Sequence, residues 1–230
     1  MNINGLQKLT LLDYPGRTAC TVFLAGCDMR CPFCHNSELI SGNAPVELTD
    51  TDLLEFLKKR KGLLDGVAFT GGEPTLRREL PDLMKKIKDM GYSVKLDTNG
   101  NHPDMLKHIL DNGLADYVAM DIKNSPERYA QTIGLDSFDM EPVYKSIALL
   151  LSSGIDFEFR TTVVDQLHDE ESFTKIGPMI EGAPRYFLQP FTDRDSVIFS
   201  GFTPPQKEKL EKYASIVSPF VGSVEIRGLE

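Results

Sequence analysis

Short apolar runs alternate with amphipathic segments along most of the chain. Most of these runs are continuous rather than alternately polar and apolar, which is typical of parallel strands covered on both faces. The pattern predicts strands over Thr18–Leu24, Gly66–Thr70, Ser93–Asp97, Tyr117–Ile122, Phe157–Val164 and Tyr186–Pro190.

Between these strands, apolar residues recur at helical spacing. Thr49 or Asp50 is suited to cap the first helix, and Gly91 and Gly113 follow the second and third helices as C-cap glycines do. The predicted helices are Thr51–Lys61, Arg78–Met90, Pro103–Asn112, Pro142–Ser153 and Glu170–Glu181, followed by a last helix at Pro204–Ile216 and a short strand at Ser223–Arg227.

Strands that alternate with helices predict an α/β fold whose strands are parallel and joined by right-handed crossovers. Six strands are too few to close an eight-stranded barrel. We therefore predict an open, partial (β/α)6 barrel with its helices outside. We expect one domain over residues 1–230, with a core at about 15–200 and a C-terminal helix and strand within 204–228.

Polar residues stand where the predicted strands end. In parallel α/β folds the functional residues gather at the C-terminal ends of the strands, so we expect these residues to share one rim. They are the cysteine loop after the first strand, Gly71–Pro74, Asp97–Gly100, Asp121 with Lys123, Arg160 with Thr162, and Gln189.

The composition narrows the class of protein. Hydrophobic residues make up 41% of the chain, and no segment approaches the apolar length that spans a membrane. The N-terminus has no secretory-signal pattern, and clustered cysteines do not make a disulfide framework, so we expect a cytoplasmic protein. A net charge of −9 argues against nucleic acid as a partner, since such binding needs clustered positive charge.

The most informative motif is Cys27-x3-Cys31-x2-Cys34. A 4Fe–4S cluster normally takes four cysteine ligands, so three cysteines leave one iron without a protein ligand. An open coordination position distinguishes catalytic from structural metal sites. The spacing therefore favours a cluster that acts on a bound molecule.

Zinc is the alternative for this motif. Cys-Pro-Phe-Cys alone is compatible with half of a zinc ribbon or with a redox dithiol. His35 could complete a zinc site, but it directly follows Cys34 and would strain to reach the same metal. The remaining cysteine, Cys20, lies inside the first predicted strand and is expected to be a core residue. A zinc-stabilised binding module without catalysis thus remains an alternative function.

An open iron needs hard donors, and the amine and carboxylate of S-adenosylmethionine supply them. Gly71 and Gly72 permit close backbone approach, and Pro74 fixes the following turn, so this edge is suited to bind the amine. The alternative for Gly71–Pro74 is a plain strand-to-helix turn.

Asp97 and Asp121 end neighbouring predicted strands, where two like charges are costly unless a cation lies near them. Lys123 or a bound ion would neutralise them and hold the carboxylate of S-adenosylmethionine. The alternative is that these aspartates cap the helices that follow.

These residues resemble the radical S-adenosylmethionine superfamily. Cys27-x3-Cys31-x-Phe33-Cys34 resembles its cluster motif, and Gly71-Gly72-Glu73-Pro74 resembles its methionine-amine motif. Cys-His-Asn at 34–36, Asp-Thr-Asn-Gly at 97–100 and Met-Asp-Ile-Lys at 120–123 resemble the activases of glycyl radical enzymes. The stretch at 5–16, with Leu-Asp-Tyr-Pro-Gly, resembles the branch that activates anaerobic ribonucleoside-triphosphate reductase.

The resemblance implies roles for individual residues. Cys27, Cys31 and Cys34 would hold the cluster. The implied cofactor contacts are Phe33, His35, Gly71, Gly72, Glu73, Pro74, Asp97, Asn99, Asp121, Ile122, Lys123, Arg160 and Gln189. Asp97, Met120 and Asp121 match positions that hold a monovalent cation in the formate-lyase activase, and Thr192 stands where that activase has a histidine.

The function implied is an anaerobic oxidoreductase that uses a 4Fe–4S cluster and S-adenosylmethionine to place a glycyl radical on a partner enzyme. The expected partner is anaerobic ribonucleoside-triphosphate reductase, with flavodoxin or ferredoxin as electron donor. A formate-lyase-type partner and a small-molecule enzyme such as 7-carboxy-7-deazaguanine synthase are the alternatives. Residues 35–50 contain no cysteine, which excludes the second cluster of a ferredoxin-like insert there.

Overall fold

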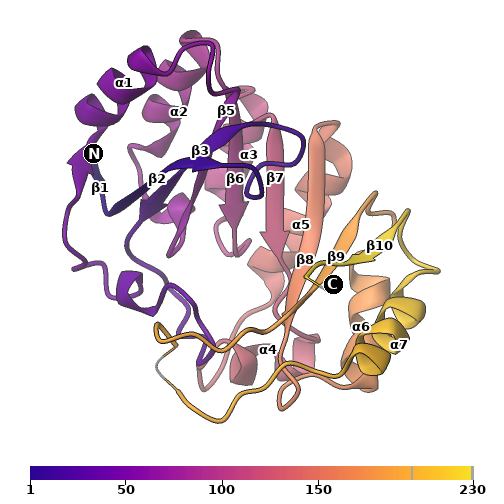
Figure 1. Cartoon of the computed structure of the whole chain (residues 1–230). Coiled ribbons are helices and arrows are strands. Elements are labelled where there is room, and N and C mark those ends of the chain that lie inside the picture. The colour runs from indigo at the N-terminus through magenta and orange to yellow at the C-terminus, as the bar shows by residue number, and fades with distance from the viewer. Residues whose placement is uncertain (198, 229–230) are drawn as a thin grey trace. The chain divides into compact units, whose positions relative to one another are not determined.

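The computed structural model describes residues 1–197 and 199–228. They form two compact units (Figure 1). The first unit comprises residues 1–28, 38–98 and 102–118, and the second comprises 29–37, 99–101 and 119–230. The boundary lies within strand β7 (Tyr117–Asp121). The single domain expected from the sequence stays a prediction.

The first unit is built on four strands. They are β2 (Gly5–Thr10), β3 (Ala19–Leu24), β5 (Gly66–Gly71) and β6 (Ser93–Thr98). β2 pairs antiparallel with β3, whereas β3, β5 and β6 are parallel to one another. A small antiparallel pair, β1 (Asn2–Ile3) and β4 (Leu48–Thr49), lies at its N-terminal side.

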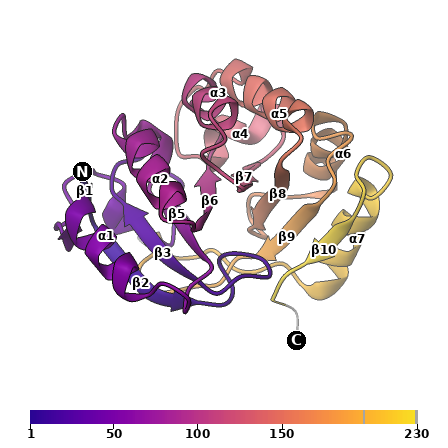
Figure 2. The ribbon, with the colours of Figure 1, turned by 90° about the horizontal axis from the view of Figure 1, so that it is seen from above.

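The two faces of the first unit's sheet differ in chemistry. Side chains alternate between faces along a strand, so Val67 and Phe69 share one face with Val94 and Leu96. Helices α1 (Asp50–Lys59) and α2 (Leu80–Asp89) lie along one side of these strands (Figure 2). The buried residues of α2, Leu80, Leu83, Met84 and Ile87, follow the spacing of an amphipathic helix, whose apolar stripe packs on a sheet.

The other face carries polar residues. Thr21, Ala68 and Lys95 lie side by side across β3, β5 and β6. Asp97 lies two residues beyond Lys95 on the same face. This face, unlike the apolar one, has side chains that can hold a ligand. A third helix of the unit, α3 (Pro103–Asp111), follows β6.

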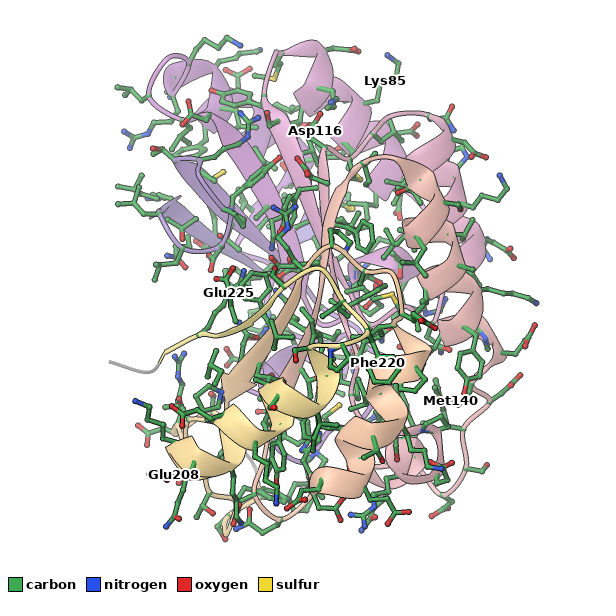
Figure 3. All side chains as sticks on the ribbon, turned by 90° about the vertical axis from the view of Figure 1, so that its right-hand side faces the viewer. Lys85, Asp116, Met140, Glu208, Phe220 and Glu225 are labelled. Carbon is green, nitrogen blue, oxygen red and sulfur yellow. The ribbon has the colours of Figure 1, made fainter. Side chains whose placement is uncertain are left out.

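The second unit contains the parallel strands β8 (Asp156–Val163), β9 (Tyr186–Pro190) and β10 (Val224–Ile226). Helices α6 (Glu170–Met179) and α7 (Lys207–Val217) run side by side, and Phe220 lies against α6 (Figure 3). The rings of Phe173 and Tyr213 stack between these helices, with centroids 4.3 Å apart. α4 (Pro126–Thr132) and α5 (Glu141–Ser153) precede β8.

A buried ion pair fastens the C-terminal strand. Arg227 donates two hydrogen bonds to the carboxylate of Glu158, at 2.7 and 2.8 Å, and its guanidinium lies 3.5 Å from the ring centre of Phe187. Glu158 is fully buried. Because an unpaired buried carboxylate is costly, Arg227 holds the segment after β10 in place.

The structure confirms an α/β fold with mostly parallel strands. All six predicted core strands and the predicted helices are present, with ends shifted by up to three residues. Thr49 caps α1 as predicted, and Gly91 and Gly113 have the positive φ of C-cap glycines. Elements that the sequence pattern missed are β1, β2, β4 and α4. No helix in the described residues is long and apolar enough to cross a membrane.

Candidate functional site

In the first unit, Glu73 joins the ends of three strands. Its carboxylate accepts hydrogen bonds from the amide and hydroxyl of Thr75 and from the hydroxyl of Thr98, the last at 2.8 Å. Its amide donates to the carbonyl of Gly26 at 2.7 Å. Glu73 is buried, and the loop after β3, the turn after β5 and the end of β6 therefore meet at this one side chain.

The two glycines before Glu73 are needed for backbone approach. Gly71 has a φ of +121°, and a Cβ there would lie 2.5 Å from the backbone of Leu24. A Cβ on Gly72 would collide with the carbonyl of Gly26. Pro74 is buried at the start of a 3-10 turn, Pro74–Leu76. The Gly71–Pro74 motif thus fits tightly against the residues that lead into Cys27.

Cys27 is followed by an ion pair that the sequence pattern did not suggest. The carboxylate of Asp28 lies 3.0 Å from Nε2 of His102, and this hydrogen bond raises the pKa of His102. His102 is the N-cap residue of α3, so Asp97 does not cap that helix. The capping alternative for Asp97 is therefore wrong.

Asp97 instead pairs with Lys95, whose ammonium donates to its carboxylate. Both side chains project from the polar face of the first unit's sheet. The Lys95 side chain is 3% exposed and that of Asp97 is 14% exposed. This buried lysine was absent from the predicted site, although its spacing of two residues from Asp97 places both on one face.

In the second unit, Cys31 and Cys34 share a turn in which the Cys34 amide donates to the Cys31 carbonyl at 3.1 Å. Phe33 is buried and contacts Phe191 edge to face, and His35 stacks on the same ring with centroids 5.6 Å apart. The ring nitrogen Nε2 of His35 lies 2.6 Å from the carbonyl of Thr192. The segment after β9 thereby holds the two residues predicted to line S-adenosylmethionine.

Asp121 lies between two basic side chains. Lys123 Nζ donates to one of its oxygens at 2.7 Å, and Arg160 Nε donates to the other. Burial opposes ionisation of Asp121, but Arg160 and Lys123 outweigh it and hold the pKa of Asp121 well below its usual value. Asp121, Lys123 and Arg160 therefore form one largely buried, hydrogen-bonded group of charged side chains.

Lys123 is fixed by its surroundings. Burial would lower the pKa of Lys123, but Asp121 outweighs this effect and raises it. The backbone of Lys123 is also held, because His168 Nε2 lies 2.8 Å from its carbonyl. His168 Nδ1 lies 3.1 Å from the amide nitrogen of Val164 and 3.2 Å from its carbonyl oxygen, and burial lowers the pKa of His168. His168 is thus a positioning residue that the sequence did not reveal.

The remaining predicted residues of the second unit occupy backbone or core positions. Ile122 is buried, and its amide donates to the carbonyl of Arg160 at 2.8 Å. Asn99 is buried and accepts from the amide of Asn101. Gln189 is half-buried opposite Thr162. Met120 is buried and packs on Gly100.

The donor chemistry fits an iron–sulfur cluster. Cys27, Cys31 and Cys34 are free thiols within one short loop, and none is fully buried. In the described residues, no group of three cysteine, histidine or acidic side chains is arranged to hold a metal ion. Cys27 belongs to the first unit, whereas Cys31 and Cys34 belong to the second. Burial raises the pKa of Cys31 to about 11, with Lys123 opposing it. Cys20 is buried in β3, as expected of a core residue.

Tyr129 is completely buried in the second unit. Burial raises the pKa of its hydroxyl, whereas a hydrogen bond to the backbone of Lys123 and the charge of Lys123 oppose this rise. Tyr129 is thus a core residue beside Lys123.

Comparison with known proteins defines the class. Residues 21–173 match the Radical SAM superfamily, and the chain belongs to this superfamily. A crystal structure of a radical SAM methyltransferase from Sphaerobacter thermophilus has a TM-score of 0.75 at 15% identity, covering 95% of this chain and 68% of the other. This likeness confirms the radical SAM type of α/β fold.

Two relatives narrow the group further. A candidate glycyl-radical enzyme activating enzyme from Methanocaldococcus jannaschii is 30% identical over 98% of this chain and 95% of its own length. The pyruvate formate-lyase-activating enzyme of Clostridium pasteurianum is 31% identical over 78% of this chain and 76% of its own. The chain is thus a radical SAM enzyme whose homologues include activases of glycyl radical enzymes.

Proposed function

We propose that the protein is the activase of a glycyl radical enzyme, and that its partner is anaerobic ribonucleoside-triphosphate reductase. The observation that carries the proposal is the Cys31–Cys34 turn close to Asp121 and Lys123, in a chain that has the three-cysteine motif and activase relatives. The N-terminal stretch at 5–16 supports the reductase as partner. A formate-lyase-type partner is the alternative.

In the proposed site, Cys27, Cys31 and Cys34 would hold the cluster and leave one iron without a protein ligand. When bound, the reduced cluster would supply the electron for cleaving S-adenosylmethionine to methionine and a 5′-deoxyadenosyl radical, which would take a hydrogen atom from a glycine Cα of the partner and become 5′-deoxyadenosine. No side chain has to transfer a proton for that abstraction. Flavodoxin or ferredoxin in the cytoplasm is the proposed electron donor.

The protein's own residues bind and orient. Lys123 and Arg160, both held by Asp121, are the basic side chains proposed to attract the carboxylate of S-adenosylmethionine. Glu73 fixes the Gly71–Pro74 turn, whose backbone binds the amine. Phe33 and His35, stacked on Phe191, line the nucleoside side. The other residues proposed to contact S-adenosylmethionine are Asn99, Ile122 and Gln189.

Electron paramagnetic resonance on anaerobically reconstituted, reduced protein tests the proposal. We expect a cluster signal that changes with S-adenosylmethionine, then a glycyl doublet near the free-electron g value after addition of the reductase. Cys31→Ala should lose both signals, whereas Cys20→Ala, which removes a core thiol of β3, should retain them.

Each failure has a separate meaning. A cluster response without a radical on the reductase would refute the reductase as partner, and a radical on a formate-lyase-type enzyme instead would establish the alternative. Zinc in place of iron in an anaerobic preparation would refute the activase and support a zinc-stabilised binding module.

A further inference from the structure

The polar face of the first unit carries a buried lysine that the proposed reaction does not use. Lys95 lies in the middle of β6, and its side chain is 3% exposed. Its neighbour across the sheet, Ala68 of β5, has no side chain beyond Cβ and leaves room for the lysine. Thr21 of β3 is next in this row, and its hydroxyl donates to Asp13.

The position of Lys95 determines its partner. Lys95 and Asp97 are two residues apart on one strand, so they project from the same face, and the ammonium donates to the Asp97 carboxylate. A buried ammonium without an anion is costly, and Lys95 cannot reach water as a surface lysine would. The side chain of Lys95 is therefore a counter-ion for Asp97 that is built into strand β6.

The resemblance to the formate-lyase activase implies a monovalent cation at Asp97, Met120 and Asp121. The residues of this chain do not fit one. Asp97 already has a univalent cation, the Lys95 ammonium, within bonding distance, and a metal ion there would meet a like charge. Asp121 is paired with both Lys123 and Arg160, and Met120 is packed on Gly100.

We propose that Lys95 replaces the monovalent cation as the charge that neutralises Asp97, so that this protein binds S-adenosylmethionine without an alkali ion. Lys95 is a positioning residue: it keeps the Asp97 carboxylate neutralised and fixed at the end of β6. The part that concerns S-adenosylmethionine rests on the proposed function, whereas the ion pair itself does not.

The first test uses cluster-free protein, with thermal unfolding in KCl compared with choline chloride at equal ionic strength. The wild type should show the same midpoint in both salts. Lys95→Met removes the ammonium and keeps the stem, so potassium should bind Asp97 and raise the midpoint by about 2–4 °C at a tenfold excess over its dissociation constant. Lys88→Met, which breaks a half-buried pair with Asp116 (the aspartate is labelled in Figure 3), is the control and should gain no potassium effect.

The second test measures the dissociation constant of S-adenosylmethionine for the reconstituted protein. Replacing KCl with choline chloride should change it less than twofold in the wild type and about tenfold in Lys95→Met. Absence of cluster or of binding would refute the proposed function but leave the cluster-free test of Lys95 standing.

Two results would overturn the inference: a potassium-specific stabilisation of the wild type, or a folded Lys95→Met variant that gains no potassium effect. Should Lys95→Met not fold, thallium-205 resonance of the wild type decides. No bound thallium ion supports the inference, and a bound ion that is lost in Asp97→Asn refutes it.

Discussion

Two carboxylates at strand ends, Asp97 in the first unit and Asp121 in the second, pair with different basic side chains. Asp97 pairs with Lys95, whose side chain is 3% exposed, while that of Asp97 is 14% exposed. Asp121 has a lysine and an arginine, and their side chains are 15% and 16% exposed. The ammonium of Lys95 is thus less accessible than the basic groups beside Asp121. The two carboxylates differ in how far their basic partners can reach a ligand.

The largest loss of stability should come from breaking the Lys95–Asp97 pair. Asp97→Asn leaves the Lys95 ammonium buried without an anion, so we expect the free energy of unfolding to fall by about 3–5 kcal/mol. Asp97→Asn combined with Lys95→Met should recover most of this loss, because neither charge remains. Urea unfolding of both variants measures the difference. Equal losses of unfolding free energy in the single and the double variant would contradict the pairing of Lys95 with Asp97.

The matching substitution in the second unit, Asp121→Asn, should reduce the free energy of unfolding by less. Asp121→Asn leaves Lys123 and Arg160 without their carboxylate, but both reach solvent more readily than Lys95 does. We therefore expect a smaller loss of unfolding free energy than for Asp97→Asn in the same urea titration. A larger loss would reverse the comparison.

Ligand binding should separate the two carboxylates next. Lys123→Met removes one positive charge and keeps the Asp121–Arg160 pair, so the fold should persist while S-adenosylmethionine binds about 10- to 150-fold more weakly, as expected for about 1.5–3 kcal/mol from a charge-assisted hydrogen bond. Equilibrium binding to the reconstituted protein measures this. The control Lys209→Met breaks an exposed pair with Asp165 and should leave affinity unchanged.

A pair of histidines extends the comparison to pH. Burial lowers the pKa of His168 in the second unit, so its stabilising contribution is present above about pH 6.5 and is lost as the pH falls through its folded pKa. The bond to Asp28 raises the pKa of His102 in the first unit, so its contribution is present below about pH 6.5 and is lost as the pH rises through its folded value.

Unfolding of cluster-free protein from pH 5 to 8 distinguishes the two histidines. His168→Gln should flatten the loss of stability on the acid side, and His102→Gln should flatten the loss on the alkaline side. Both variants keep an amide that can donate or accept. If both variants changed the dependence of unfolding free energy on pH in the same pH range, the assigned partners of the two histidines would be contradicted.

The fold was largely predictable because its strands are continuous apolar runs. The sequence pattern missed β1, β2 and β4 because they are short or carry exposed polar residues. It missed α4 because this helix is too short for apolar residues to recur at helical spacing. The cysteines and Gly71–Pro74 were readable from spacing. That the two units' polar rims form one site stays a prediction.

The partners of the site residues were less predictable, since they depend on contacts between distant segments. Glu73 meets Thr98 across 25 positions, and His168 meets the Lys123 carbonyl across 45. Neither spacing carries a signal in one sequence. Lys95 is different: a lysine two residues before an aspartate within an apolar strand implies a shared face, and that signal was available.

The smallest effect concerns the helix caps, of which each unit has a matched example. Thr49 and Asp52 form a capping box at α1, and Asp169 and Ser172 form one at α6. Thr49→Ala and Asp169→Ala should each reduce the free energy of unfolding by about 1 kcal/mol, since each removes the acceptor for an otherwise unpaired amide.

Salt should separate these caps. Asp169 is charged at a helix N-terminus and also pairs with Arg128 at 2.7 Å, although both side chains are exposed. Salt screens that charge, so the loss in Asp169→Ala should shrink by a few tenths of a kcal/mol at about 1 M NaCl, whereas the loss in Thr49→Ala should not. Equal salt dependence would mean that the cap hydrogen bond to Ser172 alone sets the value of Asp169. In that case charge would affect stability at the buried ion pairs of Asp97 and Asp121, which salt screens little, but not at the exposed helix caps.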